Sequence, residues 1–475
     1  MSHIILTDAM ASAAGLHPED RDTVRELVGT WQRCRAGNMR RGEYYLMQNK
    51  LKDLGIALPD ELKSLEVACG WAYKAVDVMR DHVQLDTIAA PDDAECDQAL
   101  ARALRRNAVG RKFDRAATSA LKYCFSLWVV TANADGTARI SEYPPTLCAG
   151  RWNEVEDRID AGMFVVEFDR FKNGQLKPAP RWVDVMTDTD LIRLTKDGAG
   201  NWAAEYEPHA MGRCPMFAMP YSPDDDRPFG VSRISKEVRW LIDCAVRATV
   251  NEEVAAAFAA STQKYLLGAE EDTFESTSKW SAYIGSIFAI TPNNDGNIPQ
   301  FGQLTQPSMQ PLTEHFTNLC KRMSAATGVH VGQLGIMTDN PTSSEAIYAE
   351  NEPLILKCKS FIRECRACLQ DVATAALAVE RGLTFGAARD LTDVSVRFLN
   401  PSMPTLSQQT DSSCKIAAAV DGFAGTPTFW RMNGLDFEES RQVDSEISRN
   451  QNAQAVSALV QALSAPAPAV GGADD

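Results

Sequence analysis

The chain has few of the residues that build metal and catalytic centres. Only six of its 475 residues are histidines, and no two of them lie close together in the sequence. Zinc sites need His or Cys ligands at short, fixed spacings. The sequence also lacks a G-x-x-x-x-G-K-[ST] phosphate loop, a dinucleotide-binding glycine fingerprint and an H-E-x-x-H pair. These absences argue against an ATPase or a zinc enzyme, and we expect no cofactor and no bound metal.

Positive charge is also in short supply. The chain has 48 Lys and Arg against 63 Asp and Glu, which gives a formal net charge of −15 and a pI near 5.0. Proteins that wrap nucleic acid neutralise its phosphates with Lys and Arg. The balance therefore disfavours a DNA-gripping surface, but it is compatible with a wall that repels DNA and lets it pass.

Long apolar runs are absent as well. No run of about 18 apolar residues occurs, so we expect no membrane span, and the N-terminus has no basic region before an apolar core, so we expect no signal peptide. The twelve cysteines are dispersed. We expect reduced thiols that pack as small apolar residues, including Cys358, Cys365 and Cys368 on one helix face.

The composition that remains is that of a folded protein. Hydrophobic residues make up 45% and charged residues 23% of the chain, and the length predicts two to four structural modules. The pattern indicates that the chain is organised around residues 309–382, where periodicity predicts a helix at 312–327, a glycine-containing loop, and a long helix at 343–382. Pro353 predicts a kink in that long helix.

Other segments follow from periodicity and turn residues. The fold class expected is α+β, mainly α. Helices are predicted at 18–35, 65–82, 94–123, 232–267, 407–420 and 436–463. Strands are predicted at 125–131, 139–143, 163–168, 182–187, 191–195, 286–291, 298–304 and 394–398, the last returning to the antiparallel region 125–220. Turns are predicted at 135–136, 173–174, 198–200 and 294–297, and loops at 215–230 and 422–427.

One loop contains a possible metal site. Asp224, Asp225 and Asp226 lie in a proline-rich stretch, and paired carboxylates can bind a divalent cation for phosphodiester chemistry. Three consecutive aspartates in such a turn project in different directions, however, and no nearby His or Glu completes a ligand set. A metal-dependent phosphodiesterase using Asp224–Asp226 is therefore kept only as an alternative.

Four segments together resemble a known family. They are the G-x-S-R-I start of 229–269, the hairpin sequence NDGNIPQFGQL at 294–304, the helix 309–329, and LGIMTDNPTSSEAIYAENEPL at 334–354. The chain resembles the portal proteins of tailed double-stranded DNA phages, in particular the Gp6-like branch found in phages of actinobacteria. The order of helix, hairpin, helix, loop and long helix agrees with that family.

The resemblance implies an architecture of wing, stem, clip and crown. Residues 1–230 would form the wing, 231–268 the first stem helix region, 269–308 the clip, 309–328 the second stem helix, and 329–342 a tunnel loop. Residues 343–404 would form a long kinked wing helix with its return strand, 405–464 the crown, and 465–475 a disordered tail.

The resemblance also implies a function. Family members form a homo-oligomeric ring, usually of twelve subunits, at one capsid vertex, and carry no ATPase. The expected partners are the major capsid protein, the terminase large subunit, the head-tail adaptor, and DNA passing through the channel. The location would be the virion, after assembly in the host cytoplasm. Channel-loop residues would be His330, Gln333, Thr338, Asp339 and Asn340, and the clip residues for partner docking would be Asn294, Asp295, Asn297 and Gln300.

A further alternative is a non-portal scaffold or adaptor built from long helices. It predicts elongated monomers or dimers, whereas a portal predicts closed rings.

Overall fold

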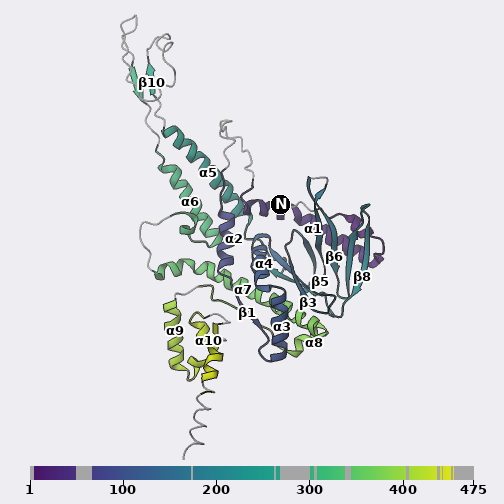
Figure 1. The fold of residues 1–475 in the computed structure, drawn as a ribbon. Coiled ribbons are helices and arrows are strands. Elements are labelled where there is room, and N and C mark those ends of the chain that lie inside the picture. Colours follow the sequence, from purple (N-terminus) through teal and green to yellow (C-terminus); the bar gives the residue numbers. More distant parts are fainter. Residues whose placement is uncertain are drawn as a thin grey trace, which may run out of the picture.

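The computed structural model describes residues 5–49, 67–172, 175–260, 264–267, 300–303, 308–336, 344–402, 406–435, 439–440, 442–450 and 453. Figure 1 shows a body of sheets and helices, a two-helix projection that leaves it on one side, and a small helical group on the other. The elements are mixed helix and sheet, as expected for the fold class. The predicted strand at 286–291, the turns at 173–174 and 294–297, and the tail lie outside the described residues.

The N-terminal part is helical. After a short 3₁₀ helix η1 (Asp8–Ser12), helix α1 (Pro18–Tyr45) extends ten residues beyond the predicted end, and α2 (Trp71–Asp81) lies within the predicted range. The single helix predicted at 94–123 is two helices, α3 (Ala94–Arg106) and α4 (Val109–Tyr123). The break occurs because Ala108 has a left-handed φ of 50° and the Asn107 amide bonds Ala103 O and Ala138 O.

The predicted antiparallel region at 125–220 is confirmed. Strands β2 (Phe125–Ala132), β3 (Ala138–Tyr143) and β9 (Met216–Pro220) form one sheet in the order β3-β2-β9. Strands β4 (Cys148–Asn153), β5 (Arg158–Lys172), β6 (Gln175–Met186), β7 (Asp190–Lys196) and β8 (Trp202–Pro208) form a second sheet in chain order, and all pairings are antiparallel.

Strand β9 corrects the prediction that 215–230 is loop throughout. Its register pairs Pro220 with Phe125 and Met216 with Val129. Proline at both its flanks suggested a loop, but β9 is an edge strand, where a missing backbone N–H is tolerated. Strands β4 and β8 were not predicted either.

The projection begins with α5 (Lys236–Ala260) and returns through α6 (Gln310–Thr327). The predicted helix 232–267 is too long at both ends. The Ser235 hydroxyl accepts from Val238 N at 3.2 Å, which starts the helix late. Residues 264–267 are not helical but form β10 (Lys264–Leu267), which pairs antiparallel with β11 (Gln300–Gln303). That pairing partner lies more than 30 residues downstream, so local periodicity could not reveal it.

The long helix α7 (Ser344–Arg381) is confirmed, with Pro353 inside it, and α8 (Phe385–Leu391) follows. Strand β12 (Ser395–Phe398) is where a strand was predicted. It does not return to the 125–220 region, however. It pairs instead with an unpredicted strand, β1 (Leu85–Ala89), to form a separate two-stranded sheet.

The C-terminal helices follow β12. Helix α9 (Leu406–Ala419) matches the prediction, and a second helix, α10 (Pro427–Met432), lies where no helix was predicted. A 3₁₀ turn, η5 (Phe423–Gly425), connects them. Of the helix predicted at 436–463, the described residues 439–440 and 442–450 are helical.

Three apolar cores arrange these elements in layers. One lies between η1, α1 and one face of the five-stranded sheet; a second lies between the two sheets. The largest packs α2, α3, α4 and α7 against the free face of the three-stranded sheet and includes Cys358, Cys365 and Cys368. The cysteines of α7 are thus core residues, as predicted. Within the described residues, no helix combines the length and apolarity that crossing a membrane requires.

Candidate functional site

The helical projection is fixed to the body at its base. Figure 1 shows α5 and α6 side by side, with β10 beyond their ends. Trp71 of α2 contacts Phe316 of α6, with ring centroids 5.7 Å apart. The Arg322 guanidinium of α6 lies 5.0 Å from the ring of Trp240 on α5, which is 45% exposed. The two helices therefore hold each other through a cation–π contact that remains open to solvent.

The G-x-S-R-I segment that precedes α5 forms the junction between projection and body. Gly230 has φ +73°, and a Cβ there would lie 2.3 Å from Tyr221 O, so only glycine fits. The Ser232 hydroxyl donates to Lys122 O at 2.6 Å and accepts from Ile234 N at 3.0 Å. Ile234 is fully buried. The motif thus turns the chain sharply and anchors it on the end of α4.

Arg233 is the central side chain of this junction. It is 7% exposed. Its Nε donates to Ala75 O at 2.5 Å, one terminal nitrogen to Thr327 O at 2.8 Å, and the other to the Tyr221 hydroxyl at 3.1 Å. A single guanidinium therefore joins α2, the loop before α5, and the last carbonyl group of α6. This arrangement sets where α6 ends and where the following loop begins.

The loop after α6 starts with tight local geometry. Gly328 ends α6 with φ +77°. His330 then caps the 3₁₀ helix η4 (Val331–Leu334), because its Nδ1 accepts from Gly332 N at 3.1 Å. The ring proton is consequently on Nε2, which lies 2.6 Å from the Glu350 carboxylate of α7. His330 therefore connects the loop to the long helix.

The predicted channel-loop and clip residues are only partly brought together. His330 is used within the protein as described, and Gln333 is exposed in η4. Gln300 is exposed in β11, where it pairs with Leu267. The other predicted site residues, Thr338, Asp339, Asn340, Asn294, Asp295 and Asn297, lie outside the described residues.

A second link joins α1 to the base of α5. The Tyr44 hydroxyl donates to both carboxylate oxygens of Asp243, at 2.8 and 2.9 Å. Burial, together with this carboxylate, raises the pKa of Tyr44 to about 12, so the phenol stays a donor at all physiological pH values. The partner, Asp243, lies some 200 residues away in the sequence, so no local pattern could reveal this contact.

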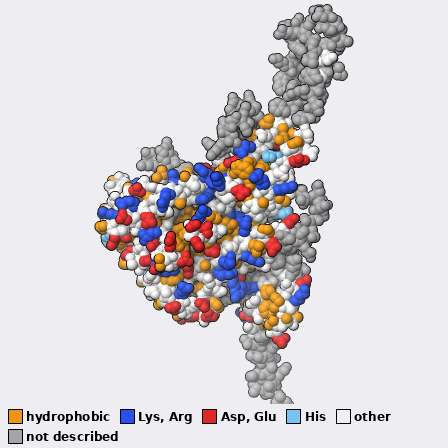
Figure 2. Space-filling view, turned by 180° about the vertical axis from the view of Figure 1, so that it is seen from behind, with side chains coloured by type: hydrophobic (Ala, Val, Ile, Leu, Met, Phe, Trp, Pro, Cys, Tyr) orange, Lys and Arg blue, Asp and Glu red, His pale blue; other side chains and the backbone are white. Residues whose placement is uncertain are grey.

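An acidic groove lies on the side of the body, with a volume of about 740 Å³. Its walls are the β4–β5 turn, β9, the loop after β9, and α7. Seven carboxylates line it, and two arginines. The carboxylates belong to Glu154, Asp157, Asp224, Asp225, Asp226, Glu364 and Asp371, and the arginines are Arg158 and Arg213. Figure 2 shows a group of acidic side chains near the centre of one face of the body, with hydrophobic side chains beside it.

The two arginines of this acidic groove are already engaged. Arg158 forms a bidentate pair with Asp188, at 2.6 and 3.0 Å. The guanidinium of Arg213 lies 5.2 Å from the ring of Phe217 and 4.6 Å from that of Phe385. With seven carboxylates against these two guanidinium groups, one of which is already paired with Asp188, the groove keeps an excess of negative charge.

The three aspartates of the alternative metal site project from the rim of this groove. A tight turn holds them, with Arg227 N donating to Asp224 O at 2.9 Å and Asp224 N to Arg227 O at 3.3 Å. All three side chains are exposed. In the part of the chain that the structure describes, the ligand grouping able to hold a metal ion is His17, Glu19 and Asp20, not these aspartates. The geometry gives the phosphodiesterase alternative no support.

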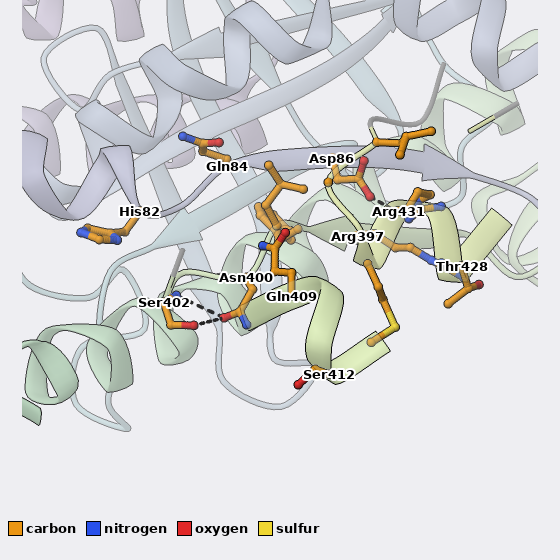
Figure 3. Close-up of a pocket in the computed structure, with 15 residues that line it drawn as sticks. His82, Gln84, Asp86, Arg397, Asn400, Ser402, Gln409, Ser412, Thr428 and Arg431 are labelled. Carbon is orange, nitrogen blue, oxygen red and sulfur yellow. Dashed lines mark hydrogen bonds and ion pairs between the residues drawn. The ribbon is translucent and has the colours of Figure 1, made fainter. Parts of the chain in front are cut away.

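A larger cleft, of about 830 Å³, separates the β1–β12 ribbon from α9 and α10. Figure 3 shows Asp86 and Arg431 reaching toward each other across it, with Arg397 beside them. The Asp86–Arg431 ion pair measures 2.7 Å, and the two side chains are 11% and 18% exposed. At the other end, His82 Nδ1 lies 2.7 Å from Pro401 O. These contacts hold the C-terminal helices onto the body.

Residues 36–451 match the family described as "Phage portal protein, SPP1 Gp6-like". The chain is 22% identical over 414 residues to the portal protein of Mycobacterium phage L5, covering 84% of this chain and 82% of that protein. It is 21% identical over 408 residues to the portal protein of Mycobacterium phage D29, covering 82% and 81%.

Solved structures with a similar chain come from gene transfer agent (GTA) particles. One is the virion of the native particle, with a TM-score of 0.46, 13% identity, and coverage of 87% of this chain and 94% of that chain. Another is the neck of the native particle computed with C12 symmetry, with a TM-score of 0.46, 13% identity, and coverage of 90% and 97%.

Proposed function

Because the chain belongs to the SPP1 Gp6-like phage portal protein family, we propose that it assembles into a closed ring at one vertex of a phage capsid. The ring, of twelve subunits, is the conduit through which DNA enters during packaging and leaves during ejection. The match over residues 36–451 carries this proposal, since it spans the body, the projection and the C-terminal helices together.

The elements take the following parts in the proposed ring. Helices α5 and α6 form the stem, and the segment 269–308 between them forms the clip. Helix α7 crosses the wing, with its kink at Pro353, and α9 and α10 belong to the crown. The separation of the two-helix projection from the sheets supports this assignment, because a projecting hairpin leaves helix faces that neighbouring subunits can cover (Figure 1).

The tunnel loop, residues 329–342, faces the DNA in this proposal. Its described part, 329–336, contains no Lys or Arg, which suits a surface past which phosphates must slide. His330 has its Nε2 proton engaged by Glu350. The imidazole therefore contributes to loop position in the conformation described, and Gln333 is the exposed polar side chain.

The clip, with Asn294, Asp295, Asn297 and Gln300, docks first the terminase large subunit and later the head-tail adaptor. The wing contacts the major capsid protein. The subunit itself performs no catalytic step, and the assembled ring resides in the virion after assembly in the host cytoplasm.

Imaging of the purified full-length chain by negative-stain electron microscopy tests the ring. Closed rings with a central hole are expected, and rotational averaging then gives the subunit number. Elongated monomers or dimers across a range of salt and protein concentrations would instead support a helical scaffold. Co-expression with the capsid protein is the decisive second experiment. A portal protein that forms no closed rings when purified alone must form them when the capsid protein is present.

A further inference from the structure

The acidic groove presents more carboxylates than its own cations compensate: its seven carboxylates share the groove with Arg158 and Arg213, and Arg158 is already paired with Asp188. Asp225 and Asp226 are exposed at the rim. Deeper in the groove, burial raises the pKa of Asp371 and of Glu364 above the ordinary values, although nearby arginines act in the opposite direction. Burial without a compensating salt bridge is costly for a carboxylate. A basic surface that entered the groove would remove that cost.

A positively charged surface, which we call the basic corner, lies where α3 meets α4 and is complementary in charge to the acidic groove. Arg102 and Arg105 of α3 and Arg111 of α4 are exposed, and none of them forms an ion pair with a described residue. Neighbouring cations on the same stretch are already used: Arg106 pairs with Glu380, and Arg115 with Glu142. In a chain of net charge −15, three unpaired arginines within ten residues are a concentrated positive surface.

The acidic groove and the basic corner lie on different sides of α7. Glu364 and Asp371, which line the groove, are seven residues apart and share one helix face. Arg366 and Gln370 point to roughly the opposite face, where they donate to Val396 O and Val394 O of the β12 segment. Helix α3 contacts α7 on the β12 side as well, through Arg381 and Glu95.

Two complementary patches on different sides of one subunit fit a ring better than a two-fold dimer. A ring built by rotation uses heterologous contacts, in which one patch of each subunit meets another patch of the next. A pair of identical patches would instead give a closed dimer. Charge complementarity also selects the partner and its register.

We propose that the acidic groove of one subunit receives the basic corner of the next subunit in the ring. The occupant is a second copy of this chain, with Arg102, Arg105 and Arg111 meeting the carboxylates at the rim and within the groove. This inference rests on the proposed ring and adds which surfaces close it.

Charge reversal on each side tests the contact. The groove variant carries Asp225→Lys and Asp226→Lys, and the corner variant carries Arg102→Glu and Arg105→Glu. All four side chains are exposed, so both variants should fold, which circular dichroism verifies. Each variant alone should lose at least tenfold in the fraction of protein in rings, measured by light scattering after size exclusion and by negative-stain imaging.

An equimolar mixture provides the sharper readout. In an alternating ring, every Lys-bearing groove meets a Glu-bearing corner, and every native groove meets a native corner. The mixture should therefore recover rings that neither variant forms alone, with both chains present in equal number by native mass spectrometry. A control chain with Glu205→Lys and Arg21→Glu, exposed on β8 and α1, should form rings as the unmodified chain does.

The outcomes separate the two proposals. Absence of rings for the unmodified chain, alone and with capsid protein, overturns the proposed function. Rings for the unmodified chain together with undiminished rings for both reversed variants overturn this inference only. Loss of rings in both variants without recovery in the mixture also overturns it, because the two surfaces would then act separately and not on each other.

Discussion

At the residue scale, the buried guanidinium of Arg233 is the side chain on which the base of the α5–α6 projection depends. It satisfies carbonyl groups from two elements and a hydroxyl from a third. Lysine could not replace it, because a single ammonium group cannot reach acceptors spread around a planar fork. A residue three positions earlier, Gly230, serves the same junction through its backbone alone.

Replacing Arg233 with Met should lower the free energy of unfolding by about 3 kcal/mol, since buried carbonyl groups of Ala75 and Thr327 lose their donor. Urea denaturation followed by circular dichroism measures the change. Lys236→Met, an exposed change three residues later, is the matched control and should cost less than about 0.5 kcal/mol. Equal losses in the two variants would contradict the role of Arg233.

Asp184 gives a prediction that depends on pH. Burial raises the pKa of this carboxyl in β6 to about 6, although Trp182 Nε1 donates to it. Between pH 3.8 and 6 the folded state binds the extra proton, so stability falls as pH rises through that window. Above pH 6 the ionised, buried group lowers stability by about 3 kcal/mol.

Asp184→Asn keeps an oxygen acceptor for Trp182 and removes the charge. The variant should therefore melt at a higher temperature than the unmodified chain at pH 8, and the difference should shrink toward zero near pH 4. Thermal denaturation at the two pH values measures it. A difference independent of pH would show that packing, and not ionisation, is responsible.

The roles of some single residues could be predicted from the sequence, and those of others could not. The cysteines of α7 could be assigned to the core because their spacing matched the apolar face. Arg233 was quoted only as part of a motif, since nothing local to it shows that its acceptors come from Ala75 and Thr327.

At the element scale, the start of the loop that follows α6 is held by local contacts at both ends. Two left-handed glycines, Gly328 and Gly335, bound it, and His330 fastens it twice, once to Gly332 and once to Glu350. The attachment point on α7 lies three residues before Pro353, whose missing N–H leaves a gap in the helix ladder. The loop is thus connected to the segment of α7 that precedes the proline.

Variants of His330 separate the two attachments. Asn at position 330 places an acceptor where Nδ1 lies and keeps the cap, whereas Gln reaches toward Glu350 but loses the cap. Hydrogen exchange at the Gly332 amide should therefore accelerate about tenfold in His330→Gln and stay nearly unchanged in His330→Asn. Glu350→Gln is the companion control, since it alters the other attachment. Unchanged hydrogen exchange at the Gly332 amide in all three variants would contradict the role of His330 in holding this loop.

Elements that are specified by nearby residues could be predicted from the sequence, whereas strands that depend on a distant pairing partner could not. Helix α7 and the β2–β3 hairpin followed from periodicity and from the Asp135–Gly136 turn. Strands β1 and β10 were missed because their partners, β12 and β11, lie far along the chain. Strand β9 was missed because of its two prolines. Proline is tolerated in an edge strand, but the sequence does not show which strand lies at the edge of the sheet.

At the scale of the whole molecule, the C-terminal helices are attached across a cleft and not packed into the core. The Asp86–Arg431 ion pair spans this cleft of about 830 Å³. Removing one partner of such a shielded pair leaves the other charge poorly compensated. The attachment of α9 and α10 should therefore depend on this pair.

Asp86→Asn should speed hydrogen exchange in α10 about tenfold, which corresponds to roughly 1.4 kcal/mol. The charge swap Asp86→Arg with Arg431→Asp should restore most of the protection. Arg397→Gln, which alters another cation of the same cleft, serves as the control and should leave α10 unaffected. A swap that is no better than the single variant would place the attachment elsewhere.

The sequence predicted which kinds of element form the layered body, but not how distant segments of the chain meet in it. Alternating patterns predicted antiparallel strands between helical parts, and the family resemblance predicted the order of the larger pieces. The acidic groove could not be anticipated, because it joins the β4–β5 turn, the loop after β9, and α7. Those segments are more than 60 residues apart in sequence and meet only when the layers stack.

Helix α7 also sets the timing of folding. Its Phe361 belongs to the same core as Trp128 of β2 and Phe217 of β9, which precede it in the chain. A ribosome adding about 5–20 residues per second needs roughly 10–50 s to travel from Trp128 to Phe361. During that interval only the earlier helices, α2, α3 and α4, cover the inner face of the three-stranded sheet, and the part that α7 later covers stays exposed. The newborn chain is therefore most vulnerable to aggregation just before residue 344 is synthesised, and slower translation of α7 would lengthen that exposure.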